Sequence, residues 1–218
     1  MKQEFPLALV VRRLKSASSA WTIPFGIRLS QSKNPFWVLI GAVLSLRTRD
    51  LVTEAAFNKL IRLGDNASSL AKLEESQVSD AIYPVAFYQE KAKNLKSLSE
   101  SIIRFYGGEP PRTIEELLTL RGVGRKTANM VLTLGYGQMG ICVDAHVHRI
   151  VNRWGYVKTK NPDGTEMALR GQLPERYWKD WNRLLVTLGQ NCCKPVSPFC
   201  RSCCIEKLCP KLGVVKFR

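Results

Sequence analysis

Four cysteines near the C-terminal end of the chain have the spacing of ligands for a metal centre. They follow the pattern Cys-x6-Cys-x2-Cys-x5-Cys and are Cys193, Cys200, Cys203 and Cys209. Four thiolates in one short segment suit either a tetrahedral metal ion or an iron–sulfur cluster, and the spacing alone does not separate zinc from iron. The chain has seven cysteines. The other three are expected to be small buried side chains, although Cys192 and Cys204 adjoin the expected ligands, so a shifted ligand set remains an alternative.

A lysine follows a glycine-rich turn in the middle of the chain. Residues 120–128 read LRGVGRKTA, between a helix that Thr113 is expected to cap, with Glu116 three residues later, and a second helix that begins near Gly124. Glycines permit a tight turn without side chains on its surface. Backbone N–H groups at the start of the second helix can then meet a DNA phosphate. The pattern predicts a helix-hairpin-helix, with an ordinary helix–helix turn as the alternative.

Lys126, in the first turn of that second helix, is a candidate nucleophile. The positive end of the helix dipole, the neighbouring Arg125 and burial would all disfavour its ammonium form. A neutral amine can attack C1′ of a nucleotide sugar and form a Schiff base. The alternative is a lysine that points outward and contacts phosphate.

Asp144 lies in the segment VDAHVHR (143–149), at the expected start of another helix. Its carboxylate could stabilise the cationic sugar that develops as a base departs, and could assist proton transfers. The alternative is a plain helix N-cap. His146 and His148 lie two residues apart and therefore point away from each other on a helix, so we expect capping or packing roles rather than a metal pair.

The charge balance of the chain favours a polyanionic partner. Its 218 residues include 33 Lys and Arg and 18 Asp and Glu, a net charge of +15. Such an excess is typical of nucleic-acid-binding proteins, although a merely soluble basic protein is the alternative. There is no apolar run of about 20 residues, and the short apolar stretch at 6–11 precedes basic residues, unlike a secretory signal. We therefore expect an intracellular protein, cytoplasmic if prokaryotic and nuclear if eukaryotic, whose cysteines bind metal rather than form disulfides.

The hydrophobic pattern predicts a nearly all-helical protein, because no segment alternates with period two. Residues 35–48 are mostly apolar, as in a buried central helix. A helix from Asp50 is expected to bury Leu51, Ala55, Leu60 and Leu63 and to end at Gly64, and an amphipathic helix is expected at 91–106. The segment 159–165 (TKNPDGT) is expected to be a polar loop.

Together, LRGVGRKTA, VDAH and the 6-2-5 cysteine spacing resemble the endonuclease III family of helix-hairpin-helix DNA glycosylases, over about residues 29–209. The resemblance implies an all-α fold of two helical domains with a DNA-binding cleft between them. One would be a six-helix domain (28–138) containing the hairpin, and the other would combine 1–27 with 139–218 and hold a C-terminal iron–sulfur cluster loop. Lys126 would be the nucleophile, Asp144 the catalytic aspartate, and the four cysteines the ligands of a 4Fe–4S cluster.

The resemblance also implies how DNA would be held. A damaged nucleotide would flip into the cleft, with Arg47 of the loop 45–50 filling the gap and Phe87 of the segment 85–92 acting as a wedge. For Phe87, a core aromatic residue is the alternative. Hairpin contacts with DNA are expected at Gly122, Val123, Gly124, Arg125 and Thr127. The chain departs from the usual family pattern at four of the motif positions, namely Arg47, Ala86, Arg121 and Ala145.

The family therefore implies a bifunctional DNA glycosylase and abasic-site lyase for oxidised pyrimidines in base excision repair. It would work as a monomer on double-stranded DNA, with no membrane partner. One alternative is a monofunctional mismatch glycosylase that removes thymine or adenine. Another is a non-catalytic DNA-binding protein with a structural zinc site.

Overall fold

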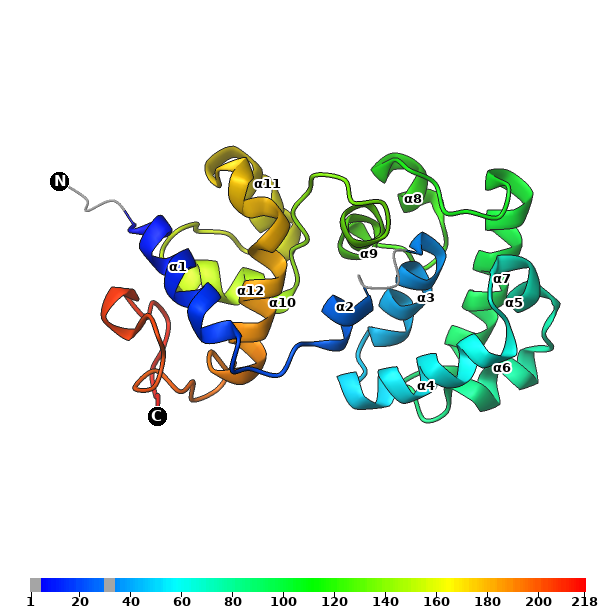
Figure 1. Cartoon of the computed structure of the whole chain (residues 1–218), viewed down its shortest axis with the longest axis horizontal. Coiled ribbons are helices and arrows are strands. Elements are labelled where there is room, and N and C mark those ends of the chain that lie inside the picture. The colour runs from blue at the N-terminus through cyan, green and yellow to red at the C-terminus, as the bar shows by residue number, and fades with distance from the viewer. Residues whose placement is uncertain (1–4, 30–33) are drawn as a thin grey trace. The chain divides into compact units, whose positions relative to one another are not determined.

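The structure is a computed structural model that describes residues 5–29 and 34–218 (Figure 1). Those residues form helices and loops and contain no β-strand, which confirms the all-helical prediction. None of their helices is long and apolar enough to cross a membrane. The α-helices are α1 (Leu7–Ser18), α2 (Phe25–Arg28), α3 (Pro35–Ser45), α4 (Asp50–Leu63), α5 (Ala67–Lys72), α6 (Glu75–Ile82), α7 (Tyr88–Tyr106), α8 (Ile114–Thr119), α9 (Arg125–Met130), α10 (Ala145–Arg153), α11 (Pro162–Gln172) and α12 (Trp178–Asn191).

The chain divides into two compact units. The inserted unit is Phe25–Gly140, and the terminal unit combines the chain up to Pro24 with Ile141–Arg218. The domain expected at 28–138 lies within the inserted unit. Six helices are expected there, whereas the described part of the inserted unit has eight α-helices, α2 to α9. The difference arises because the structure includes several short helices of only four to six residues.

Helix α3 is the centre of the inserted unit. Asn34 caps it through a bond from the Trp37 N–H at 3.2 Å, and Pro35 occupies its first turn. Every residue from Phe36 to Leu44 is buried, as the uninterrupted apolar sequence predicts. The helix ends at Ser45 rather than at residue 48, because Leu46 leaves the helical conformation with a ψ of 120° and Arg47 is left-handed with a φ of 55°.

Helix α4 buries a different face from the one expected. The prediction of Leu51, Ala55 and Leu63 as core residues is wrong, since Leu51 is 82% exposed and the other two are also exposed. The buried residues are Thr53, Ala56, Phe57 and Leu60. This set has the 3.6-residue helical period, and the apolar residues near the two helix ends do not belong to it.

Helix α7 is the longest described helix and packs against α5 and α6. It begins at Tyr88, three residues before the expected start, and ends at Tyr106, where Gly107 adopts a φ of 65° and closes the helix. Its core face carries Leu95, Leu98 and Ile102. Phe105, an apolar residue near its C-terminal end, is exposed.

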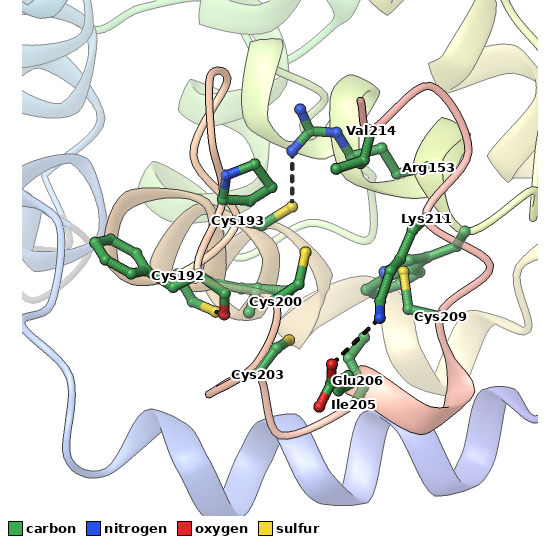
Figure 2. A pocket seen from close by; sticks show the side chains of 14 residues that line it. Arg153, Cys192, Cys193, Cys200, Cys203, Ile205, Glu206, Cys209, Lys211 and Val214 are labelled. Atoms are coloured by element: carbon green, nitrogen blue, oxygen red, sulfur yellow. Dashed lines mark hydrogen bonds and ion pairs between the residues drawn. The ribbon is translucent and has the colours of Figure 1, made fainter. Parts of the chain in front are cut away.

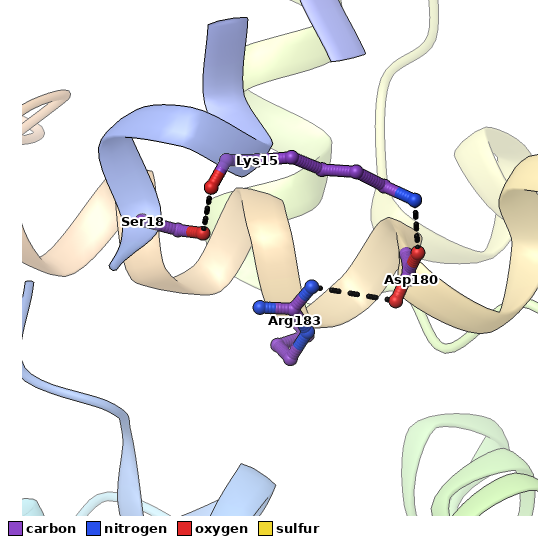
Figure 3. Close-up of polar contacts among 4 residues, drawn as sticks. All are labelled: Lys15, Ser18, Asp180 and Arg183. Carbon is purple, nitrogen blue, oxygen red and sulfur yellow. Dashed lines mark hydrogen bonds and ion pairs between the residues drawn. The ribbon is translucent and has the colours of Figure 1, made fainter. Parts of the chain in front are cut away.

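The terminal unit is built on a second core, around α10 and α12. Trp181 and Trp154 form its aromatic centre, and Phe5 stacks on Trp154 with ring centroids 5.5 Å apart. Helix α1 is a helix that the sequence analysis does not identify. It packs on α12, where the Lys15 ammonium lies 2.6 Å from an Asp180 carboxylate oxygen, and Arg183 reaches the other oxygen (Figure 3).

The polar segment at 159–165 is only partly a loop, and the prediction is wrong from residue 162 onward. Asn161 caps α11 by accepting from the Gly164 N–H at 2.8 Å, and Pro162 occupies the first helical position. Asn followed by Pro is a helix-start signal as much as a turn signal.

One histidine of α10 has a structural contact with α11. His148 Nδ1 lies 2.7 Å from the Thr165 hydroxyl, within hydrogen-bonding distance.

Candidate nucleic-acid interface and cysteine-lined cavity

The hairpin between α8 and α9 has the geometry predicted for the glycine-rich turn. Leu120 and Val123 are buried and anchor the turn, and the Val123 N–H donates to the Leu120 carbonyl at 3.1 Å. Gly122 has a φ of 77°, and a Cβ there would lie 2.4 Å from Asn94 Nδ2. Glycine is therefore favoured at this position by its backbone conformation, and a larger residue would also have to displace the Asn94 side chain.

Gly124 has a different role from Gly122. Its φ is −97°, and a Cβ there would meet no atom within 4 Å, so the fold makes no steric demand. It is the N-cap of α9 and offers no side chain to accept from the first-turn N–H groups. That end of α9 therefore suits an anion such as a phosphate. Since the side chains of Val123 and Thr127 are buried, contacts with DNA there would come from the backbone.

The two candidate catalytic residues lie at helix starts in different units. Lys126 is the second residue of α9 and is partly buried, in the inserted unit. Asp144 is the N-cap of α10 in the terminal unit, and its Oδ1 accepts from the N–H groups of His146 and Val147 at 2.8 and 2.9 Å. The N-cap alternative for Asp144 is thus realised. Within the described part of the chain its Oδ2 makes no hydrogen bond, which leaves one oxygen for chemistry.

Arg47 and Phe87 lie together on the surface of the inserted unit. The Arg47 guanidinium carbon lies 5.7 Å from the centroid of the Phe87 ring, and the Phe87 side chain is 61% exposed. The core-aromatic alternative for Phe87 is therefore wrong. Both residues are left-handed, with φ of 55° and 59°. Such strain in non-glycine residues concentrates at functional sites.

Lys91, which the sequence analysis does not single out, lies directly beneath this pair. It is 8% exposed, and its Nζ donates to the carbonyls of Leu44 at 2.8 Å and Leu46 at 2.6 Å. Burial lowers the pKa of Lys91 to about 8. A lysine within a helical segment gives no sign of burial in a sequence, since the same pattern fits an exposed side chain.

The four spaced cysteines line one cavity in the terminal unit. Figure 2 shows Cys193, Cys200, Cys203 and Cys209 around the space between them, which is about 370 Å³ including its open mouth. Arg153 donates to the Cys193 sulfur at 3.2 Å and to the Lys194 carbonyl at 2.7 Å, which ties the loop to α10. No three His, Cys, Asp or Glu side chains of residues 5–29 and 34–218 converge closely enough to hold one metal ion.

The remaining cysteines differ from these four. Cys192 also lines the cavity, but its thiol donates to the Phe199 carbonyl at 3.2 Å. Cys142 is buried as expected, whereas Cys204 is only partly buried. The Cys192 proton is therefore engaged by a backbone carbonyl, whereas a cysteine must lose its proton to bind metal. The geometry thus favours Cys193 over Cys192 as a ligand.

Comparisons with known proteins identify the family of this chain. A family model described as HhH-GPD superfamily base excision DNA repair protein matches residues 40–175. Endonuclease III of Thermotoga maritima is 43% identical over 182 residues, which cover 84% of this chain and 85% of that protein. Endonuclease III homolog 2, chloroplastic, of Arabidopsis thaliana is 42% identical over 85% of this chain, but the chain spans only 50% of that longer protein.

Solved structures also support membership of this family. A trapped endonuclease III–DNA covalent intermediate is 32% identical, with a TM-score of 0.77, over 82% of this chain and 84% of that one. A thermostable thymine-DNA glycosylase, at 23% identity and a TM-score of 0.74 over 92% of this chain and 96% of that one, shares the fold. The family match over residues 40–175 and the identity to endonuclease III show that the chain belongs to the HhH-GPD superfamily of base excision DNA repair proteins, and within it to the endonuclease III family.

Proposed function

We propose that this chain removes oxidised pyrimidines from double-stranded DNA and then cuts the strand at the abasic site. As a member of the endonuclease III family, it is a DNA glycosylase and abasic-site lyase of base excision repair. The observation that carries the residue assignment is the position of Lys126 in the first turn of α9, directly after the hairpin that suits a phosphate.

In the proposed reaction, the Lys126 amine attacks C1′ of the damaged nucleotide. The new C–N bond forms as the bond between the sugar and the base breaks, and the base leaves with the electron pair and takes up a proton. The C1′–O4′ bond of the sugar ring then breaks, and the ring oxygen takes up the second proton of the nitrogen, which leaves a Schiff base between the lysine and C1′. Removal of a C2′ proton then expels the 3′ phosphate by β-elimination. Hydrolysis of the Schiff base returns the lysine.

Asp144 has two supporting roles in this proposal. Its Oδ2 atom, which takes no part in the helix cap, would stabilise positive charge on the sugar while the base departs. It would also accept and return protons in the later steps. The proposal requires Lys126 and Asp144 to face the same nucleotide. Arg47 would fill the gap left by that nucleotide, and Phe87 would stack against the neighbouring bases.

The cysteine-lined cavity suits a 4Fe–4S cluster, which we propose as the cofactor. Around one zinc ion, with Zn–S distances of about 2.3 Å, four sulfurs stand only about 3.8 Å apart. In a cluster each cysteine binds a different iron, so the sulfurs stand farther apart. The four cysteines that line one cavity provide the set of thiolate ligands that such a cluster needs. When bound, it would supply cross-links that fix the loop 193–209. Cys193→Ser should abolish the visible absorbance and bound iron, whereas Cys192→Ser should keep both.

The function is tested with duplexes that each contain one defined lesion. The proposal predicts release of an oxidised pyrimidine and strand cleavage on its 3′ side, and no release from an undamaged duplex. Release of thymine or adenine from a mismatch without strand cleavage would instead support a monofunctional glycosylase. Binding without any base release or cleavage would support the non-catalytic alternative.

A further inference from the structure

Lys91 is buried in an unusual way for a lysine. Its ammonium reaches three acceptors, namely the carbonyls of Leu44 at 2.8 Å and Leu46 at 2.6 Å and the Thr48 hydroxyl at 3.3 Å. Burial, with no charged partner contributing, lowers its pKa to about 8. Burying a cation costs free energy unless its protons are all bonded, and three acceptors match the three donors of an ammonium group.

All three acceptors belong to the end of α3 and the segment that follows it. The Leu44 carbonyl is in the last turn of α3, where unpaired carbonyls and the negative end of the helix dipole attract a cation. Leu46 and Thr48 flank Arg47, whose φ of 55° is unfavourable for a side chain of that kind. Lys91 therefore holds both neighbours of the strained residue.

The same network reaches Phe87. The Thr48 hydroxyl that accepts from Lys91 also accepts from the Ala86 N–H at 3.2 Å, which precedes Phe87. Lys91 itself lies one helical turn after Phe87, and its N–H donates to the Phe87 carbonyl at 2.9 Å. One side chain thus connects the Arg47 loop (residues 45–49) to the Phe87 loop (residues 83–87).

We propose that Lys91 is a positioning residue that holds the Arg47 loop and the Phe87 loop together in the strained form that enters DNA. The inference rests on the proposed function, because it assigns the two loops to the lesion site. Strain of this kind persists only where the surroundings hold it in place, and the buried ammonium supplies three such bonds. Without it, the loops would relax and present Arg47 and Phe87 less often in the inserted geometry.

The test is Lys91→Met, which keeps a long apolar stem and removes the donors. Its matched control is Lys96→Met, because Lys96 lies on the same helix and also donates to a helix-end carbonyl, that of Leu73 at 2.9 Å, but away from the two loops. Single-turnover excision of an oxidised pyrimidine from a duplex should fall by roughly 10- to 100-fold in Lys91→Met. It should stay within about twofold of wild type in the control, since a partly exposed bond contributes little.

Two readouts separate positioning from general damage to the fold. Cleavage of single-stranded DNA with an abasic site needs no gap filling, so Lys91→Met should retain it. Adding Lys91→Met to Arg47→Ala should cost little more than Arg47→Ala alone, because both remove the same insertion. Equal loss on both substrates, or fully additive losses, would overturn the inference.

Thr48→Val provides a second variant if Lys91→Met does not fold. It removes the hydroxyl shared by Lys91 and the Ala86 N–H, and should lower duplex excision several-fold with single-strand cleavage kept. Wild-type behaviour of Thr48→Val would then count against the inference. A wild-type protein that cuts neither substrate would refute the proposed function instead, so the two failures are distinguishable.

Discussion

At the residue scale, Asp144 combines a structural and a proposed chemical role in one carboxylate. Oδ1 holds the first turn of α10 through two N–H groups, while Oδ2 is left for the sugar. The N-cap and catalytic interpretations of the sequence are therefore compatible. A helix cap also fixes the carboxylate in one orientation, which is what electrostatic stabilisation of a transition state requires.

Substitutions at Asp144 should separate the two roles. Asp144→Asn keeps a good cap and should change the free energy of unfolding by less than about 1 kcal/mol, whereas Asp144→Ala should lose about 1 kcal/mol. Both should lower the single-turnover excision rate by about 100-fold or more, because both remove the charge. Thermal unfolding beside excision kinetics checks this. An active Asp144→Asn would show that the charge is not needed.

Residues whose roles are local could be identified from the sequence, and residues whose roles depend on packing could not. The four cysteines and the hairpin lysine are marked by short-range spacing. The buried state of Lys91 depends on the end of α3, more than 40 residues earlier in the chain. Likewise, Phe87 is exposed and has a left-handed backbone conformation, and the sequence around it specifies neither property.

At the element scale, the two glycines of the hairpin turn have different roles. Gly122 is favoured by the fold, and Gly124 is proposed to leave room for a DNA phosphate. Gly122→Ala must place a Cβ against Asn94 at a φ of 77°, and should cost more than about 1 kcal/mol of stability. Gly124→Ala meets no atom, and should keep most of the stability while weakening DNA binding by crowding the phosphate. Unfolding curves and DNA titrations check both variants. Equal stability loss in both would contradict this division.

Helices, like single residues, can be predicted from the sequence where their burial does not depend on distant parts of the chain. The uniformly apolar sequence of α3 predicts a buried helix whatever surrounds it. An amphipathic helix such as α4 has apolar residues outside its main apolar face, and the sequence alone does not show which of them the neighbouring helices bury. The start of α11 at Asn161-Pro162 could have been recognised from its cap, since both residues have the expected helix-start preferences.

At the scale of the whole molecule, the net charge of +15 should dominate the affinity for DNA. Each phosphate neutralised contributes about 0.9 to the slope of log K against log salt concentration, so about five contacts would give a slope near −4.5. Lesion-containing and undamaged duplexes should share most of this slope, because the contacts proposed for the hairpin are with the DNA backbone and not with the bases. Titrations at several salt concentrations measure it, and an affinity independent of salt would contradict a phosphate-based interface.

The central claim is that Lys126 is the nucleophile of a Schiff-base lyase. Its most direct test is borohydride trapping on a duplex with one oxidised pyrimidine, with wild type beside Lys126→Ala. Wild type should form a covalent protein–DNA adduct, and the variant should form none. An adduct that persists in Lys126→Ala, or base release by wild type without any adduct, would contradict it.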